Sequence, residues 1–272
     1  MQKCPFRAIV SDLDGTLLNA NHVIGDFTIE TLQKLAAKGI DIMLATGRNH
    51  TDLMPILKKV NIENAVMITS NGARAQDLQG NLLVRNYLPE RIALEIMNLP
   101  FDRTRVCVNS YQGDDWFINI EVPQLRKYHQ DSGFMYEVVD FAQHHGRATE
   151  KVFFIGREPQ DLVEIEAHLK KTYGDVTSIT YSTPQCLEVM NRNVSKASAL
   201  AQVLAERDYD MQQCLAFGDG MNDVQMLTQV GKGCVMGNAD PRLKAACPDL
   251  EVIGFNAQES VANYIRTIFD IV

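Results

Sequence analysis

Short apolar runs alternate with amphipathic helical segments at both ends of this 272-residue chain, and this alternation limits the fold more than any other feature. We predict strands at 6–11, 40–45 and 65–68 and helices at 28–38 and 52–60. The alternation resumes at Ser195 and ends in a predicted helix at 260–269. Strands separated by helices favour parallel pairing with right-handed crossovers, so the pattern predicts an α/β fold with a Rossmann-like parallel sheet core.

The pattern changes between about residue 73 and Ser195. Turn chemistry at 77–81 and 112–115 lies between short β-rich runs, which is typical of hairpins. We predict further strands at 104–109, 116–120, 151–155 and 186–190 and helices at 90–97 and 161–171. The sequence therefore predicts a discontinuous core of residues 1–84 and 190–272, interrupted by an inserted α+β domain of residues 85–189.

Composition excludes several classes of protein. The 26 Lys and Arg residues are outnumbered by 34 Asp and Glu, and a formal net charge of -8 without a basic run argues against duplex binding. No apolar stretch approaches the length of a membrane span, and the start at Met1–Pro5 lacks a signal-peptide pattern. The six cysteines form no metal-binding spacing, and without a signal-peptide pattern we expect reduced thiols in a cytoplasmic protein. From the charge and the apolar pattern we expect it to bind neither nucleic acid nor membrane.

The strongest local signal is Asp12-Leu13-Asp14-Gly15-Thr16-Leu17, directly after the first predicted strand. Ligands of open parallel sheets bind at the carboxyl ends of strands, where this segment begins. Two carboxylates spaced two apart on an extended backbone point to the same side. An isolated acidic turn is the alternative, since Asp and Gly both favour turns.

Polar segments also follow other predicted strands. They are Thr46-Gly47-Arg48, Ser70-Asn71-Gly72 and Gly218-Asp219-Gly220-Met221-Asn222-Asp223, while Ser195-Lys196 opens a helix. Each alone has a simpler interpretation, because Ser195, Asp219 and Asp223 are also typical helix caps. With Asp12 and Asp14, the residues Asp219 and Asp223 make four carboxylates at strand ends, which would repel one another without a cation. Mg²⁺ prefers such oxygen ligands.

These motifs, in this order, resemble those of the haloacid dehalogenase superfamily over essentially the whole chain. The inserted unit and Ser70-Asn71-Gly72-Ala73 are similar to the Cof-like branch with its α/β cap, and more narrowly to bacterial pyridoxal phosphate and sugar phosphate phosphatases. The resemblance implies a Mg²⁺-dependent phosphatase that hydrolyses small phosphomonoesters through an aspartyl-phosphate intermediate. It implies a small phosphorylated metabolite as the partner.

The resemblance also implies roles for individual residues. Asp12 would be the nucleophile, and Asp14 the acid and base that serves the leaving group and then water. Mg²⁺ would be held by the Asp12 carboxylate, the Asp14 backbone carbonyl and Asp219, and Asp223 would orient a metal-bound water or Lys196. The transferring phosphoryl group would be bound by Thr46, Lys196, Asn222 and the backbone N–H groups of Leu13 and Gly47.

Leaving-group contacts are less specified by the sequence. Candidates are Asn71, Arg74, Tyr111, Trp116, Arg126 and Glu188, for which surface or core packing is the alternative. A phosphomutase on a sugar phosphate and a non-catalytic phospholigand-binding protein are the rival functions. An acid beside a nucleophile argues against the pure binder, which gains little from such a pair.

Overall fold

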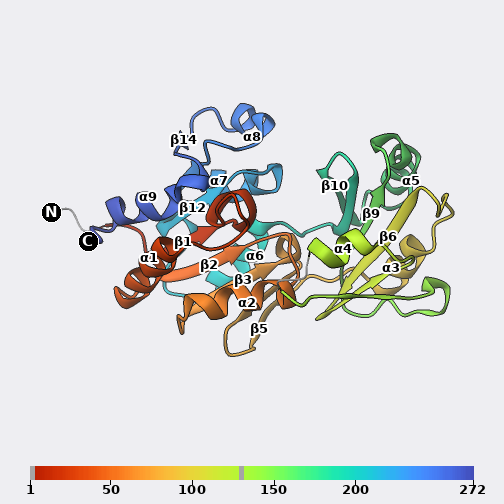
Figure 1. The fold of residues 1–272 in the computed structure, drawn as a ribbon, viewed down its shortest axis with the longest axis horizontal. Coiled ribbons are helices and arrows are strands. Elements are labelled where there is room, and N and C mark those ends of the chain that lie inside the picture. The colour runs from red at the N-terminus through yellow and green to blue at the C-terminus, as the bar shows by residue number, and fades with distance from the viewer. Residues whose placement is uncertain (1–3, 129–131) are drawn as a thin grey trace. The chain divides into compact units, whose positions relative to one another are not determined.

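The structure is a computed structural model that describes residues 4–128 and 132–272, and its chain forms two compact units. The core unit comprises residues 1–48, 53–84 and 195–272. The inserted unit comprises residues 49–52 and 85–194, so the chain leaves the core unit and later returns to it. Figure 1 traces this path by colour from the N-terminus to the C-terminus.

The core unit is built on an eight-stranded sheet of order β14-β13-β12-β1-β2-β3-β4-β5. Its strands are β1 (Ala8–Ser11), β2 (Asp41–Ala45), β3 (Ala65–Thr69), β4 (Arg74–Asp77), β5 (Leu82–Arg85), β12 (Cys214–Gly218), β13 (Lys232–Val235) and β14 (Glu251–Val252). The six strands from β14 to β3 pair in parallel, which confirms the predicted parallel α/β sheet. β4 runs antiparallel to β3, because only the short turn Ser70–Gly72 joins the two strands.

The central strands are apolar along their whole length because both faces of the sheet are covered. Every residue of β1, β3 and β12 is buried. The helices of this part of the chain are α1 (Asp26–Ala37), α2 (His50–Val60), α6 (Lys196–Leu204), α7 (Val224–Gln229), α8 (Pro241–Ala246) and α9 (Ser260–Ile268). α1 packs against α9, and α6 against α7. The polar ends of these buried strands are therefore the places where chemistry can reach solvent.

Helix α1 begins two residues before its predicted start at Thr28. The carboxylate of Glu259, far along the chain, accepts hydrogen bonds from the Thr28 N–H and hydroxyl at 3.1 and 2.8 Å. This cap comes from a residue 231 positions away, so no local pattern shows it.

The inserted unit carries a six-stranded sheet of order β10-β11-β9-β6-β7-β8. Its elements are α3 (Glu90–Met97), β6 (Val106–Gln112), β7 (Asp115–Ile118), α4 (Pro123–Tyr128), β8 (Tyr136–Val138), β9 (Thr149–Gly156), α5 (Val163–Tyr173), β10 (Thr177–Thr183) and β11 (Cys186–Asn191). The pairs from β10 to β7 are antiparallel, as the hairpin signals predict. The edge pair β7–β8 is parallel. None of the helices in the described ranges combines the length and hydrophobicity of a membrane span.

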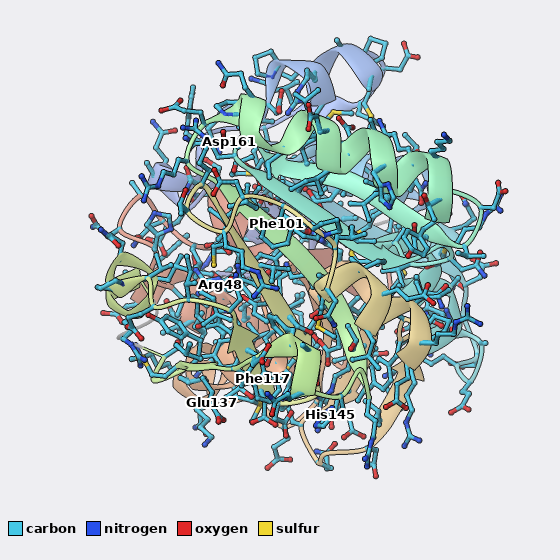
Figure 2. The ribbon with its side chains drawn as sticks, turned by 90° about the vertical axis from the view of Figure 1, so that its right-hand side faces the viewer. Arg48, Phe101, Phe117, Glu137, His145 and Asp161 are labelled. Carbon is cyan, nitrogen blue, oxygen red and sulfur yellow. The ribbon has the colours of Figure 1, made fainter. Side chains whose placement is uncertain are left out.

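Alternate residues of β9 face two different apolar clusters. Val152 and Phe154 belong to the cluster that includes residues of α3 and α5. Phe153 belongs to an aromatic cluster on the other face, with Tyr111 and Trp116. On the side of α3, Phe117 and His145 form an edge-to-face pair with centroids 6.4 Å apart, and both are labelled in Figure 2.

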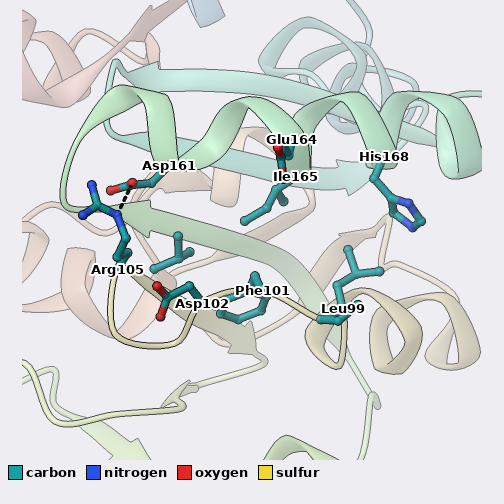
Figure 3. Close-up of a pocket in the computed structure, with 10 residues that line it drawn as sticks. Leu99, Phe101, Asp102, Arg105, Asp161, Glu164, Ile165 and His168 are labelled. Carbon is teal, nitrogen blue, oxygen red and sulfur yellow. Dashed lines mark hydrogen bonds and ion pairs between the residues drawn. The ribbon is translucent and has the colours of Figure 1, made fainter.

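A surface pocket of about 330 Å³ lies within the inserted unit, between α5 and the loop after α3 (Figure 3). Its apolar floor includes Phe101 and Ile165. The Arg105 Nε donates to Asp161 Oδ1 across the rim at 2.6 Å. The pocket contains no residue of the sequence motifs.

Candidate active site

The carboxyl end of β1 delivers Asp12 to the edge of the core sheet. Its backbone N–H donates to the Phe217 carbonyl of β12 at 3.0 Å, which fixes the segment against the neighbouring strand. The Asp12 side chain is only 9% exposed. After it, Asp14 and Gly15 leave helical geometry, Asp14 with ψ of 125° and Gly15 with φ of 77°. The chain therefore turns sharply just past two carboxylates, as the Asp-x-Asp-Gly pattern predicts.

Lys196 lies fully buried between two carboxylates. Its ammonium group donates to Asp12 Oδ1 at 2.5 Å and to Asp223 Oδ1 at 2.6 Å. Lys196 and Asp223 are both 0% exposed. The lysine is the first residue of α6, and Ser195 is the N-cap of that helix. The predicted capping role of Ser195 is therefore confirmed, and the same helix start places Lys196 in the site. A buried charge is tolerated only when it is paired and hydrogen-bonded, and both conditions hold here.

Asp219 completes the acidic group from the loop after β12. The Thr16 hydroxyl donates to Asp219 Oδ1 at 2.9 Å. Gly15 lies so close that a Cβ there would come within 2.3 Å of Asp219 Oδ2, so both the contact and its positive φ require glycine. The other oxygen of Asp223 accepts from the N–H groups of Asp219 and Gly220 at 3.0 and 2.9 Å. Asp223 thus caps its own loop while it holds Lys196.

The charges of this group do not balance. Burial raises the pKa of Asp12 well above its ordinary value, against the opposing effect of Lys196, and Asp223 and Asp219 raise it further. Burial likewise raises the pKa of Asp219. Burial lowers the pKa of Lys196, but Asp12 and Asp223 outweigh it, so that the pKa lies above its ordinary value. The ammonium therefore stays charged, and the carboxylates carry the unrelieved repulsion.

The acidic group fits a divalent cation. Asp12, Asp219 and Asp223 each offer one oxygen, and these three oxygens lie within 4.8 Å of one another. Three carboxylates against one ammonium leave an excess of negative charge, which a divalent cation would offset. Hard oxygen donors without His or Cys are the set that Mg²⁺ prefers.

Asp14 is held by Arg48 rather than by Lys196. The guanidinium makes a two-pronged contact, with Nε 2.7 Å from Oδ2 and Nη2 2.6 Å from Oδ1. His22 lies beside the same carboxylate, its Nδ1 3.6 Å from Oδ1. The Asp14 side chain is 36% exposed, far more than that of Asp12. The two carboxylates of the motif thus have different surroundings: Asp12 is buried beside Lys196, whereas Asp14 is partly exposed and paired with Arg48.

The predicted phosphate-binding residues of the neighbouring strand ends lie in the same unit. Thr46 is buried at the end of β2, and its hydroxyl accepts from the Arg48 N–H at 3.1 Å. Gly47 faces the side chain of Asn71. Asn222 is exposed on the loop after β12 and donates through Nδ2 to Asn71 Oδ1 at 2.9 Å.

The candidates for leaving-group contact are spread over both units. Arg74, on β4, is buried and donates through Nε to Gln76 Oε1 at 3.1 Å. Glu188, on β11 of the inserted unit, accepts from Lys151 Nζ at 2.8 Å. Tyr111 and Trp116 are buried in the aromatic cluster, and Arg126 pairs with Glu121 at 2.7 Å.

Sequence reasoning assigned no contact to Thr16 or to the Arg48 side chain. Both stand inside recognised motifs, but their partners, Asp219 and Asp14, come from other strand ends. The position of Arg48 directly after Thr46-Gly47 at a strand end could have predicted that its guanidinium pairs with a carboxylate. All six cysteines are free in the structure; Cys107 and Cys214 are buried, and Cys186 is partly buried.

The chain matches the family model for haloacid dehalogenase-like hydrolases over residues 9–265. It is 62% identical over 265 residues to a protein of Haemophilus influenzae named "Putative phosphatase", covering 97% of each chain. It is 36% identical over 261 residues to an HMP-PP phosphatase of Yersinia pestis, covering 96% of this chain and 94% of the relative.

The fold has close counterparts among solved structures. A haloacid dehalogenase-like hydrolase from Bacteroides thetaiotaomicron superposes with a TM-score of 0.84 at 26% identity, covering 97% of this chain and 100% of that one. A second such hydrolase, from B. subtilis, has a TM-score of 0.82 at 22% identity over 96% and 99% of the chains, which supports the fold alone. The motifs, the fold and the relatives agree: the chain belongs to the haloacid dehalogenase-like hydrolases, as a phosphatase of the Cof type.

Proposed function

We propose that this phosphatase hydrolyses small phosphomonoesters with the help of Mg²⁺, through an aspartyl-phosphate formed on Asp12. The observation that carries the proposal is the fully buried Lys196, held between Asp12 and Asp223 with Asp219 beside them. A lysine in this place binds the anionic substrate and offsets charge on the nucleophile. We further propose that residues 1–84 and 190–272 form the catalytic core and residues 85–189 a cap.

The chemistry proceeds in two displacements. A carboxylate oxygen of Asp12 attacks phosphorus, the bond from phosphorus to the leaving oxygen breaks, and Asp14 gives its proton to that oxygen. Asp14 then takes a proton from a water molecule whose oxygen attacks the same phosphorus. The bond to Asp12 breaks, and inorganic phosphate leaves with both residues restored.

The remaining residues orient and neutralise the transferring group. Lys196, Thr46, Asn222 and the N–H groups of Leu13 and Gly47 would bind its equatorial oxygens, over which the transition state spreads charge. Asp12, the Asp14 carbonyl and Asp219 would hold Mg²⁺, which supplies charge neutralisation and a fixed orientation for the phosphate when bound. Asp223 acts through Lys196, whose ammonium it holds. Arg48 keeps the Asp14 side chain in one orientation between turnovers.

The substrate class is proposed from two sources. The sequence motifs resemble pyridoxal phosphate and sugar phosphate phosphatases, and a relative at 36% identity is named an HMP-PP phosphatase. We therefore propose a small phosphorylated metabolite, with Asn71, Arg74 and Glu188 as candidate contacts beyond the phosphoryl group.

The test is a screen of phosphomonoesters with and without Mg²⁺. The panel contains pyridoxal phosphate, hexose phosphates, HMP-PP and p-nitrophenyl phosphate, ranked by kcat/KM. We expect turnover that chelation abolishes and Mg²⁺ restores, and an Asp12→Asn protein that folds but loses all but about a thousandth of the activity. Metal-independent turnover, or more than a few per cent of activity in Asp12→Asn, would contradict the proposal.

A further inference from the structure

The turn Ser70–Gly72 has an unusual backbone that the proposed chemistry does not explain. Its three residues all have positive φ, at 48°, 57° and 104°. Glycine adopts this region freely and asparagine tolerates it, but serine does so at a cost. Strained backbone of this kind persists only where surrounding contacts enforce it, and it gathers at functional sites.

The contacts that enforce the turn come from the proposed phosphate-binding segments. The Ser70 N–H donates to the Arg48 carbonyl and the Asn71 N–H to the Thr46 carbonyl, both at 2.9 Å. On the other side, a Cβ at Gly72 would lie 2.2 Å from the Ser195 carbonyl oxygen. The turn therefore lies directly against the residue that precedes Lys196, and it joins the loop after β2 to the start of α6.

The side chain of Asn71 extends this connection to a third segment. Its Oδ1 accepts from Asn222 Nδ2 at 2.9 Å. A Cβ built on Gly47 would lie 3.2 Å from the same Oδ1, so the amide group lies over the backbone of Gly47. Asn71 is 6% exposed, whereas Asn222 stands on an exposed loop. A fixed acceptor that holds one N–H of Asn222 leaves the orientation of its second N–H defined as well.

We propose that Asn71 is a positioning residue for the phosphoryl group: through its side-chain amide it fixes Asn222, and through its left-handed turn it fixes the spacing of Gly47 from α6. This inference rests on the proposed function. It differs from the sequence-based hypothesis that Asn71 contacts the leaving group, because a positioning residue acts on every phosphomonoester alike.

The variant Asn71→Gly separates the side chain from the backbone. Glycine accepts positive φ, so the turn is kept while the amide is removed. Asn61→Gly is the matched control, since Asn61 has φ 52° at the end of α2 and is exposed. We expect kcat/KM to fall about tenfold to a hundredfold in Asn71→Gly, by the same factor for p-nitrophenyl phosphate and a hexose phosphate. The inhibition constant of inorganic phosphate should rise, and Asn61→Gly should match the parent protein.

A double-mutant cycle tests whether Asn71 acts through Asn222. In an Asn222→Ala background, Asn71→Gly should cost much less than it does in the parent chain. Independent losses, a loss that depends on the leaving group with unchanged phosphate inhibition, or unchanged kinetics would each overturn the inference.

A readout without turnover keeps this inference separable from the proposed function. The side-chain amide signal of Asn222 is assigned by nitrogen-edited NMR as the one that Asn222→Asp removes. Asn71→Gly should shift that signal and weaken phosphate binding to the Mg²⁺-loaded protein, measured by calorimetry. If no phosphomonoester is turned over, the proposed function fails, and an Asn222 signal unmoved by Asn71→Gly overturns the positioning role by itself.

Discussion

Lys196 in the core unit and Lys151 in the inserted unit are both buried, but their surroundings differ. Lys196 meets Asp12 and Asp223, with Asp219 nearby, so anionic groups outnumber it. Lys151 donates to the carboxylate of Glu188 at 2.8 Å, and its ammonium lies 4.9 Å from the ring centroids of Tyr111 and Phe153. The first ammonium lies among three carboxylates, whereas the second lies beside a carboxylate and two aromatic rings.

This difference separates an acidic group that would attract a cation from an ion pair that lies beside aromatic rings. Burial raises the pKa of Asp12, and the nearby carboxylates of Asp223 and Asp219 raise it further, because both effects disfavour its ionised form. Such stored repulsion is relieved when a cation binds. Lys151 and Glu188 carry opposite charges, and the aromatic faces of Tyr111 and Phe153 favour the ammonium.

The largest expected effect follows removal of the charge at Lys196. Lys196→Met should abolish detectable turnover and lower the free energy of unfolding by about 3–5 kcal/mol, because it leaves buried carboxylates without a partner. Urea unfolding and steady-state kinetics measure the two effects. A variant that keeps both stability and activity would remove Lys196 from the site.

The matched change in the inserted unit should cost less. Lys151→Met should lower the free energy of unfolding by about 1–3 kcal/mol, since Glu188 loses the ammonium that donates to it. The double variant Lys151→Met with Glu188→Gln should regain most of that loss, because no uncompensated charge remains. Urea unfolding of the two variants checks this expectation. Equal losses for Lys151→Met and Lys196→Met would break the contrast between the two lysines.

Mg²⁺ should stabilise the protein in a pH-dependent way. The raised pKa values of Asp12 and Asp219 favour their protonated forms in the metal-free fold. The stability that these two protonated groups contribute is therefore lost as pH rises from the ordinary carboxyl range through the raised pKa values. Mg²⁺ competes with those protons. Saturating metal should raise Tm more at about pH 8 than at about pH 5.5, by an amount that corresponds to about 2–3 kcal/mol.

Differential scanning fluorimetry with Mg²⁺ and with a chelator measures these shifts. Asp219→Asn should remove most of the effect, because it takes one ligand and one repelling charge away. A Mg²⁺ shift that is the same at both pH values would show that the metal binds elsewhere.

The smallest effect concerns the cysteines, which test how firmly each unit is packed. Burial raises the pKa of Cys107 and of Cys214 to about 12. Both thiols should therefore resist iodoacetamide at about pH 8 and react only when urea unfolds their unit. Mass spectrometry of the digested protein follows each cysteine. Earlier labelling of Cys107 than of Cys214 would show that the inserted unit opens before the core.

The parallel core and the motif residues could be predicted from the sequence because their signals are local. Buried parallel strands such as β1 read as continuous apolar runs, and the motif begins where such a run ends. The strand ends of one sheet meet at one edge, which brings Asp12 and Asp219 together in any chain of this pattern. Family membership adds the expected roles.

Contacts between distant segments could not be predicted in this way. The pairing of Arg48 with Asp14 and of Asn71 with Asn222 joins loops whose separation only the fold fixes. The start of α1 depends on Glu259, and α5 begins two residues after its predicted start because Glu158 and Asp161 form a capping turn before it. Such tertiary caps leave no local pattern.

The most direct test of the account is to trap phosphate on Asp12. Protein turning over a good substrate with Mg²⁺ is quenched in acid, digested with a protease that works in acid, and analysed by mass spectrometry, because acyl phosphates survive best at low pH. The account predicts a phosphoryl adduct on the peptide that contains Asp12, formed at least as fast as turnover and absent in Asp12→Asn. Turnover without that adduct, or with the adduct on another residue, would contradict it.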